Sequence, residues 1–348
     1  MKPATHILGI DIAKNKFDVN LRLVASTEQR PAAGFSNNVK GFAQLQQWLH
    51  KQAAVPPDQL HACLEATSRY GDTLAQFLQA QGYQVSMVNP RRTRAYADSQ
   101  LTRNINDKID ARLIADFCAA ERDKLRLWEP LSSDHAQLRE LTRARQALVD
   151  QRNDFANLLE TATGLGRKIF QKQLQALERQ IQRLEKAIQR FAQQELRPDL
   201  LKQIELADTV KAVGFITAAT VLAELPPLEK MTQADQAVAF FGLDPIKKIS
   251  GTSVNTPARI SRMGSRRGRR ALYMPALCAL RFNPIVRELG LRLQAKGRSG
   301  KYIVVAAMRK LLRLIFGVIK HRKPFDPNWS NPTAPQPKAQ TAAVAQAS

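Results

Sequence analysis

Residues 1–128 alternate between short apolar runs and amphipathic stretches. Apolar runs, or strict alternation of apolar and polar residues, predict strands at four places: His6–Lys14, Lys16–Leu23, Leu60–Leu64 and Tyr83–Val88. Apolar residues three and four apart predict three helices, which follow Asn37–Asn38, span Tyr70–Gln81 and begin around Asp107–Asp110. The order β-β-α-β-α-β-α is typical of an α/β domain, and residues 1–128 are predicted to form one.

From residue 129 onward the pattern becomes mainly helical. Between residues 174 and 191, six apolar residues recur at spacings of three and four among charged neighbours: Leu174, Leu177, Ile181, Leu184, Ile188 and Phe191. This seam predicts a helical hairpin or coiled coil over residues 129–199, used for core packing or for dimerisation. Residues 200–330 are predicted to form a mainly α-helical domain. The Pro-, Ala-, Gln- and Thr-rich residues 331–348 are predicted to form a disordered tail.

A carboxylate interrupts the first apolar strand. Asp11 lies in the run H-I-L-G-I-D-I-A-K, where a charge without compensation is costly. It either opens a turn or helps to bind a metal ion. A second acid, Glu65, follows the buried run Leu60–Leu64, and the carboxyl ends of strands are where open α/β sheets place their active sites.

Two further acids lie at the start of a predicted helix. Asp107 and Asp110 are three residues apart, so they project from one face near the helix N-terminus. Helix capping would explain one of them, but two such acids together with Asp11 and Glu65 favour a metal site. Carboxylates without His or Cys suit Mg²⁺, and such a site can hold two ions that act on a phosphodiester.

The net charge of +23 and the isoelectric point near 10.4 predict a polyanionic partner, most simply nucleic acid. Residues 259–323 hold eighteen Lys and Arg and one acid, so the binding surface is expected there. A membrane surface is the alternative, but no apolar run is long enough to span a membrane. The residues expected to bind nucleic acid are Lys247, Lys248, Arg259, Arg262, Arg266, Arg267, Arg269 and Arg270.

The cysteines and one serine give two further observations. The three cysteines are far apart and form no C-x-x-C motif, which argues against a zinc site or a disulfide framework and fits a reducing cytoplasm. Ser250 precedes a glycine and lies between lysines and arginines, which could stabilise its alkoxide during attack on a phosphodiester. Most Ser-Gly pairs are turns, so both interpretations of Ser250 stay open at this point.

Several motifs occur in the order found in a known family. They are G-I-D-I-A-K at 9–14, L-E-A-T at 64–67, N-x-x-D-K-I-D-A-R at 104–112, and S-G-T-S-V, R-I-S-R-M-G and R-R-A-L-Y-M-P-A within 250–276. Over residues 6–327 the chain resembles the insertion-sequence-110 family of transposases, the DEDD recombinases related to the Piv and MooV invertases. It departs from the family pattern at residues 212–215, where A-V-G-F stands in place of P-G-I-G.

The resemblance implies a RuvC-like, RNase-H-type N-terminal domain, a coiled-coil insertion and a C-terminal transposase domain. It implies that Asp11, Glu65, Asp107 and Asp110 bind Mg²⁺, and that Ser250 is the nucleophile that forms a covalent link to DNA. It also implies a homo-oligomer, a dimer or a tetramer, that acts on double-stranded donor and target DNA. In at least some members, a structured non-coding (bridge) RNA pairs with both DNA molecules and selects the sites.

The leading hypothesis is therefore a site-specific DNA recombinase that moves an insertion element, guided by such an RNA. One alternative is a DNA invertase with the same chemistry, in which the protein selects the sites. Another is a junction-resolving Mg²⁺ endonuclease, in which water is the nucleophile and Ser250 has no role. A last one is a basic RNA-binding protein without enzymatic activity, in which the acids are structural.

Overall fold

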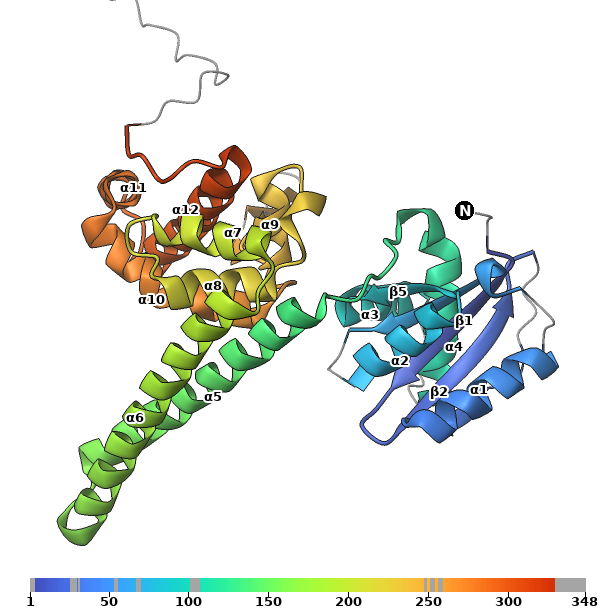
Figure 1. The fold of residues 1–348 in the computed structure, drawn as a ribbon. Coiled ribbons are helices and arrows are strands. Elements are labelled where there is room, and N and C mark those ends of the chain that lie inside the picture. The colour runs from blue at the N-terminus through green and yellow to red at the C-terminus, as the bar shows by residue number, and fades with distance from the viewer. Residues whose placement is uncertain are drawn as a thin grey trace, which may run out of the picture. The chain divides into compact units, whose positions relative to one another are not determined.

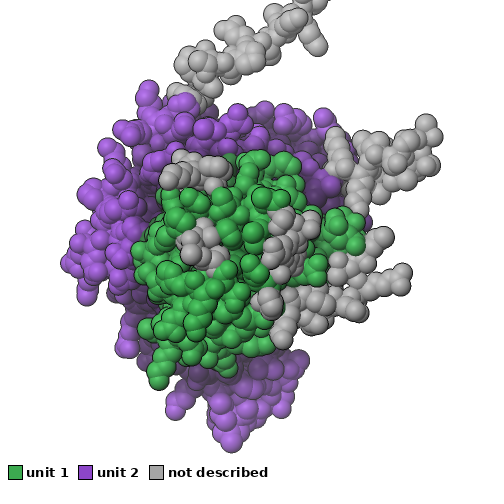
Figure 2. All heavy atoms as spheres, turned by 90° about the vertical axis from the view of Figure 1, so that its right-hand side faces the viewer, with its two compact units in different colours: residues 1–131 green, residues 132–348 purple. Residues whose placement is uncertain are grey.

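The computed structural model describes residues 4–25, 30, 32–52, 56–66, 70–100, 107–246, 249–250, 254–255 and 259–328. The chain forms two compact units, Met1–Leu131 and Ser132–Ser348, which Figure 2 colours separately. Unit 1 is a mixed α/β structure, and the described part of unit 2 is mainly helical. Lys247, Lys248, the Ser250 side chain and the tail expected at 331–348 lie outside the described residues.

Unit 1 is built on a five-stranded mixed sheet with the order β3-β2-β1-β4-β5 (Figure 1). β1 pairs antiparallel with β2 and parallel with β4, which in turn pairs parallel with β5. The strands are β1 His6–Ile12, β2 Lys16–Leu23, β3 Ala33–Ser36, β4 Leu60–Glu65 and β5 Gln84–Val88. This topology brings β1 and β4 together at the centre of the sheet.

Helices cover both faces of this sheet, because its strands are apolar on both sides. One face packs on α1 Val39–Gln52 and α2 Tyr70–Ala80, in a core that includes Leu8, Ile10 and Leu64. The other face packs on α4 Asp107–Glu121, in a core that includes Ile7 and Cys63. β2 was expected to be half-buried, but five consecutive residues of it are buried because α4 covers its second face.

Two elements of unit 1 are absent from the sequence prediction. β3 is a short edge strand of four residues, and its glycine and serine gave no alternating apolar signal. α3 runs from Pro90 to Ser99, where the dipeptide Asn89-Pro90 predicts only the end of the preceding strand. The Asn89 side chain caps α3 by accepting a hydrogen bond from the Arg91 amide at 2.9 Å, and Pro90 occupies the first turn. The dipeptide Asn-Pro therefore begins a helix here.

Unit 2 begins with two long helices, α5 Ser133–Thr161 and α6 Gly164–Gln194, which lie side by side (Figure 1). Leu177, Ile181 and Ile188 of the predicted seam are buried. Arg145 of α5 donates a 2.7 Å hydrogen bond from Nε to Glu185 of α6. A charged pair between the two helices thus stands beside the apolar contacts.

The remaining helices of unit 2 surround the hydrophobic core of that unit. The beginning of α5 and the end of α6 also contribute to this core, through residues such as Leu138 and Phe191. They are α7 Pro198–Asp208, α8 Phe215–Glu224, α9 Ala234–Phe240, α10 Arg266–Phe282, α11 Pro284–Ala295 and α12 Gly300–His321. Between α9 and α10 lie four strands of two residues each: β6 Pro245–Ile246, β7 Ile249–Ser250, β8 Val254–Asn255 and β9 Arg259–Ile260. β6 pairs with β9, and β7 pairs with β8.

Candidate functional site

Asp11 and Glu65 end up at the same level of two neighbouring parallel strands. The register of β1 and β4 pairs Gly9 with Cys63 and Ile10 with Leu64, so Asp11 and Glu65 are the next residues on each strand. Side chains alternate between the faces of a strand, and Ile10 and Leu64 belong to the core beneath α1 and α2. Asp11 and Glu65 therefore face the opposite side, the side that α4 covers.

A glycine brings α4 unusually close to this part of the sheet. A Cβ atom on Gly9 would lie 2.2 Å from the Ala111 carbonyl oxygen and 2.4 Å from the Ala115 amide nitrogen, so any side chain at this position would hold the helix away. Asp110 precedes Ala111 in the first turn of α4, and Asp11 lies two residues beyond Gly9 on β1. The close approach of α4 to β1 thus brings the backbone positions of Asp110 and Asp11 into the same region of unit 1.

Glu65 is held by a threonine that sequence reasoning did not single out. The Thr93 hydroxyl, on the first turns of α3, donates to Glu65 Oε1 and also lies 2.9 Å from the Pro90 carbonyl oxygen. A hydroxyl has one proton, and the charged carboxylate is the stronger acceptor. Thr93 is only 4% exposed, so this contact is shielded from water and fixes the orientation of the Glu65 carboxylate.

A further carboxylate faces the same side of the sheet. Asp18 of β2 stands directly opposite Asp11 in the antiparallel register and is 7% exposed. Its Oδ2 lies 3.4 Å from Lys16 Nζ, and its Oδ1 leans toward Gly34 of β3. Like charges opposite one another are unfavourable, so Lys16 offsets part of the charge that this pair concentrates.

The core of unit 1 also contains a row of polar side chains that contact one another. The Ser86 hydroxyl donates to the Arg126 carbonyl oxygen at 2.9 Å, so His61 Nε2, 2.8 Å away, is the donor to Ser86. His61 Nδ1 lies 3.8 Å from Cys118 Sγ. The hydrogen bond with Cys63 lowers the pKa of the Cys118 thiol to about 6, and the same bond and burial raise the pKa of Cys63. Each of these four side chains therefore has a hydrogen-bond partner in the core.

The donor chemistry of the predicted site fits magnesium, because carboxylate oxygens are the hard ligands that this ion prefers. Among the described residues, no group of three or more His, Cys, Asp and Glu side chains is placed to hold a metal ion. The Asp107 side chain lies outside the described residues, although its backbone begins α4. The four-acid metal site thus stays a prediction, to which the structure adds the convergence of β1, β4 and α4.

The predicted serine lies in unit 2, on the short hairpin of β7 and β8. Ser250 pairs with Val254 across the two strands, and residues 251–253 lie outside the described residues. Lys247 and Lys248, which we expected beside it, lie outside the described residues. The structure therefore places the Ser250 backbone in β7, opposite Val254 of β8, and its catalytic role stays a prediction.

The arginines expected to bind nucleic acid have different surroundings. Arg259, Arg262, Arg266 and Arg267 are exposed, as binding to a large polyanion requires. Arg269 instead donates from Nη1 to the carbonyl oxygens of Phe241 and Gly264, at 2.8 and 2.9 Å. These bonds satisfy the backbone of the loop before α10, so Arg269 has a structural role that its place in the R-R-G-R-R run did not reveal.

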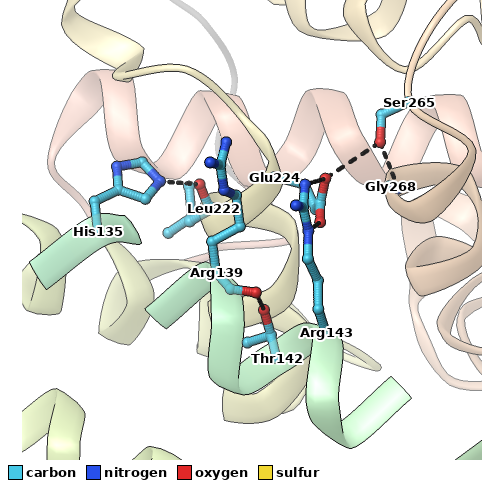
Figure 3. A network of polar contacts seen from close by, with 8 residues as sticks. All are labelled: His135, Arg139, Thr142, Arg143, Leu222, Glu224, Ser265 and Gly268. Atoms are coloured by element: carbon cyan, nitrogen blue, oxygen red, sulfur yellow. Dashed lines mark hydrogen bonds and ion pairs between the residues drawn. The ribbon is translucent and has the colours of Figure 1, made fainter. Parts of the chain in front are cut away.

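The N-terminus of α10 is fixed by a polar network (Figure 3). The Ser265 side chain caps the helix by accepting from the Gly268 amide at 3.1 Å, and its hydroxyl donates to Glu224 Oε2 at 3.5 Å. Glu224, at the end of α8, accepts two hydrogen bonds from Arg143 of α5, at 2.7 and 3.1 Å. One buried ion pair thus ties α5, α8 and α10 together.

Two family models match this chain, and together they cover most of it. Residues 8–162 match the transposase family of DEDD type that is named for IS110, and residues 204–290 match the transposase IS116/IS110/IS902 family. The chain is also 30% identical, over 327 residues, to the pilin gene-inverting proteins of Moraxella bovis and Moraxella lacunata. These alignments cover 92% of this chain and 97% of each relative.

The chain belongs to the IS110 family of transposases. This confirms the family indicated by the sequence motifs. The transposase is therefore an enzyme of DNA recombination, and DNA is its substrate. Among the helices that the structure describes, none combines the length and the apolar character needed to cross a membrane.

Three residues of the transposase that bear on the site do not stand out in the sequence. Gly9 is part of an apolar strand, and Asp18 lacks the placement at a strand end or helix start that singles out the other acids. Thr93 lies in a helix that was not predicted. For Gly9 a signal existed, since a glycine inside a buried strand often marks a close approach of another backbone.

Proposed function

We propose that this transposase is a site-specific recombinase that moves an insertion element, cutting and rejoining DNA through a covalent link to Ser250. One observation carries the proposal: β1 and β4 bring Asp11 and Glu65 to the same level of the sheet, on the face where Gly9 admits the close approach of α4 at Ala111 and Ala115. The first turn of α4, directly before Ala111, contains Asp107 and Asp110, the other two acids of the proposed set. The proposed domains are a RuvC-like domain over 1–128, a coiled coil over 129–199 and a transposase domain over 200–330.

The four carboxylates would hold Mg²⁺, with two ions as the expected number. A bound ion of this kind stabilises the negative charge that develops on phosphate oxygens. Thr93 keeps one oxygen of Glu65 directed toward α3, which presets the orientation of the carboxylate before any ion arrives. The burial of Thr93 excludes water from this contact, so the orientation is maintained during the reaction.

Ser250 would act as the nucleophile. A bond forms between its Oγ and the phosphorus of the scissile phosphodiester, the bond from phosphorus to a deoxyribose oxygen breaks, and that oxygen leaves as a hydroxyl after taking up a proton. In the reverse direction, a hydroxyl of another strand attacks the phosphoserine and releases Ser250. The phosphate bond energy is kept throughout, so the strands can be rejoined without a nucleotide cofactor.

The proposal extends to a guide RNA and to a homo-oligomer, both of which rest on the family resemblance. A second candidate function is DNA inversion with site selection by the protein. It is favoured by the 30% identity to two proteins named as pilin gene-inverting proteins. The two candidates share their chemistry and differ in what reads the DNA sequence.

The central experiment compares four variants in a recombination assay that also detects covalent protein–DNA adducts. Ser250→Ala should abolish both the adduct and strand exchange, whereas Ser253→Ala, a serine of the same S-G-T-S motif, should retain them. Asp11→Asn should abolish cleavage, whereas Asp123→Asn, which removes an exposed acid outside the predicted set, should retain it. Cleavage without an adduct in Ser250→Ala would instead support the junction-resolving endonuclease.

A second experiment distinguishes the two recombinases. The protein is co-expressed with the DNA that flanks its gene and purified, and the bound nucleic acid is sequenced. A discrete RNA from the flank supports RNA guidance. If recombination proceeds on purified DNA with protein that carries no such RNA, the protein-read invertase is the better description.

A further inference from the structure

Helix α10 has one buried side and one strongly exposed side. Gly268, Leu272, Ala276 and Ala279 are buried, and the helix packs on α8, α11 and α12. Residues three or four apart lie on one face of a helix, and the stripe opposite the buried one is Arg266, Arg270, Tyr273, Leu277 and Arg281. At about 1.5 Å per residue, its two terminal arginines are about 22 Å apart along the helix axis.

This exposed side combines positive charge with large apolar groups. Tyr273 is 50% exposed, Met274 is 62% exposed and Phe282, in the last turn, is 69% exposed. The helix carries Arg266, Arg267, Arg270 and Arg281 on its outer side and has no acid in its sequence. Arginines beside an exposed aromatic ring are the usual combination where proteins bind unpaired nucleic acid strands.

The surface is also held rigidly. The network of Ser265, Glu224 and Arg143 fixes the N-terminus of α10 (Figure 3). The two hydrogen bonds of Arg269 fix the loop before it. Arg270, itself part of the stripe, donates a 2.6 Å hydrogen bond to Asp150 of α5, which holds its guanidinium in place and offsets its charge. Little conformational entropy is left to lose when a ligand binds such a surface.

We propose that the outer side of α10 binds a single strand of DNA, with Tyr273 stacked on an unpaired base and Arg266 and Arg281 contacting phosphates on either side. DNA is the polyanion that the established activity supplies. In a duplex the faces of the bases are already stacked on one another, so a protein can bind the duplex through arginine contacts with its phosphates alone. An exposed aromatic ring between them offers a stacking surface to a strand whose bases are open.

A second copy of the chain is a poorer occupant of this surface. Most homodimers are two-fold symmetric, and a two-fold contact would place Arg266, Arg267 and Arg281 of one copy against those of the other. Like charges in contact disfavour association. The charge on α10 therefore points to nucleic acid, and an effect of Tyr273 on assembly would be evidence against the proposal.

The test measures the binding of labelled single-stranded DNA and of the corresponding duplex, by fluorescence anisotropy at one fixed salt concentration. Tyr273→Leu keeps an apolar side chain but removes the ring, and should weaken binding of the single strand by about tenfold while duplex binding stays within about twofold. Tyr273→Phe should bind like the wild type. The matched control is Tyr302→Leu, which removes another exposed tyrosine. Tyr302 lies on α12, and the guanidinium of Arg298, just before that helix, lies over its ring.

A second measurement uses the unaltered protein, so that it does not depend on the folding of a variant. Single strands containing iodouracil are cross-linked by light, and the modified peptide is identified by mass spectrometry. An adduct on Tyr273 supports the proposal, and adducts confined to other residues overturn it. Equal losses on the single strand and the duplex, or a smaller assembly of Tyr273→Leu in sedimentation, would also overturn it.

Discussion

The close approach of α4 to the sheet makes Gly9→Ala the most informative single substitution in unit 1. The added Cβ atom would lie 2.2 Å from the Ala111 carbonyl oxygen, 2.4 Å from the Ala115 amide nitrogen and 2.8 Å from the Ala115 Cβ atom. All three belong to the helix itself rather than to the end of a flexible side chain. The substitution must therefore move α4 or β1.

The size of the effect follows from these distances. Ordinary van der Waals contact begins at 3.4 Å, so the Ala111 oxygen has to move by about 1.2 Å. Overpacking of this kind typically costs about 1–3 kcal/mol, and we expect the upper end because backbone atoms must shift. A displacement of about 1 Å at a reacting centre can reduce a rate about 100-fold, and Asp110 moves with Ala111.

The assay follows urea unfolding by tryptophan fluorescence, because Trp48 and Trp128 both pack against the core of unit 1. DNA cleavage is measured on the same preparations. The matched control is Gly71→Ala in α2, on the other face of the sheet, where a Cβ atom would make ordinary van der Waals contacts, with Met87 Cε at 3.5 Å, Ile12 Cγ2 at 3.8 Å and Leu64 Cδ2 at 4.0 Å. Alanine at that helical position should be neutral or stabilise the unit by about 0.5–1 kcal/mol.

The reasoning is refuted if Gly9→Ala unfolds at the same urea concentration as the wild type and cleaves DNA at the same rate. Unchanged stability with a lost activity would mean that α4 adjusts at little cost but that its acids must stay in place. Reduced stability with full activity would separate the packing of α4 from the site. Only a loss of both supports the role assigned to Gly9.

Three further predictions concern other contacts. Thr93→Val removes the hydroxyl at nearly constant volume and should raise the Mg²⁺ concentration required for half-maximal cleavage by about tenfold, whereas Thr93→Ser should not; a Mg²⁺ titration of both variants checks this. Glu224→Gln leaves Arg143 without its charged partner in a site where the Glu224 side chain is 6% exposed, and should lower the free energy of unfolding by about 3 kcal/mol in denaturation followed by circular dichroism; an unchanged midpoint would contradict the structural importance of the pair. Burial lowers the pKa of His135 below 6.5, so unfolding takes up a proton and the free energy of unfolding should fall as the pH drops below about 6.5. In the same assay, His135→Gln should lose less stability than the wild type between about pH 7.5 and about pH 5.5. Equal losses in the two proteins would contradict this assignment.

The strands and long helices could be predicted because their signal is local. Apolar runs at β1, β4 and β5 and the seam of α6 follow from the period of the hydrophobic residues alone. α3 was missed because only three of its ten residues are Ala or Tyr and none is another apolar residue, so it has little apolar pattern. Its start is set by the cap and by a proline in the first turn, a weaker signal than hydrophobic period.

The acids could be named from their residue types and positions, and the family from the order of the motifs. Their spatial relation could not be predicted, because it depends on the strand order β3-β2-β1-β4-β5 and on a parallel register between segments more than 50 residues apart. The same limit applies to the arginines. Arg269 and Arg266 have the same chemistry in the sequence, and only the folded loop at Gly264 shows that Arg269 is used internally.

Periodicity, charge and motif order thus establish the class of this protein, because they are properties of neighbouring residues and of composition. The tertiary structure decides which of the candidate residues act together. Gly9 admits α4, Thr93 orients Glu65, and the buried side of α10 turns its arginines and Tyr273 outward. Each of these depends on contacts between elements distant in the chain, where close packing and not local preference determines the outcome.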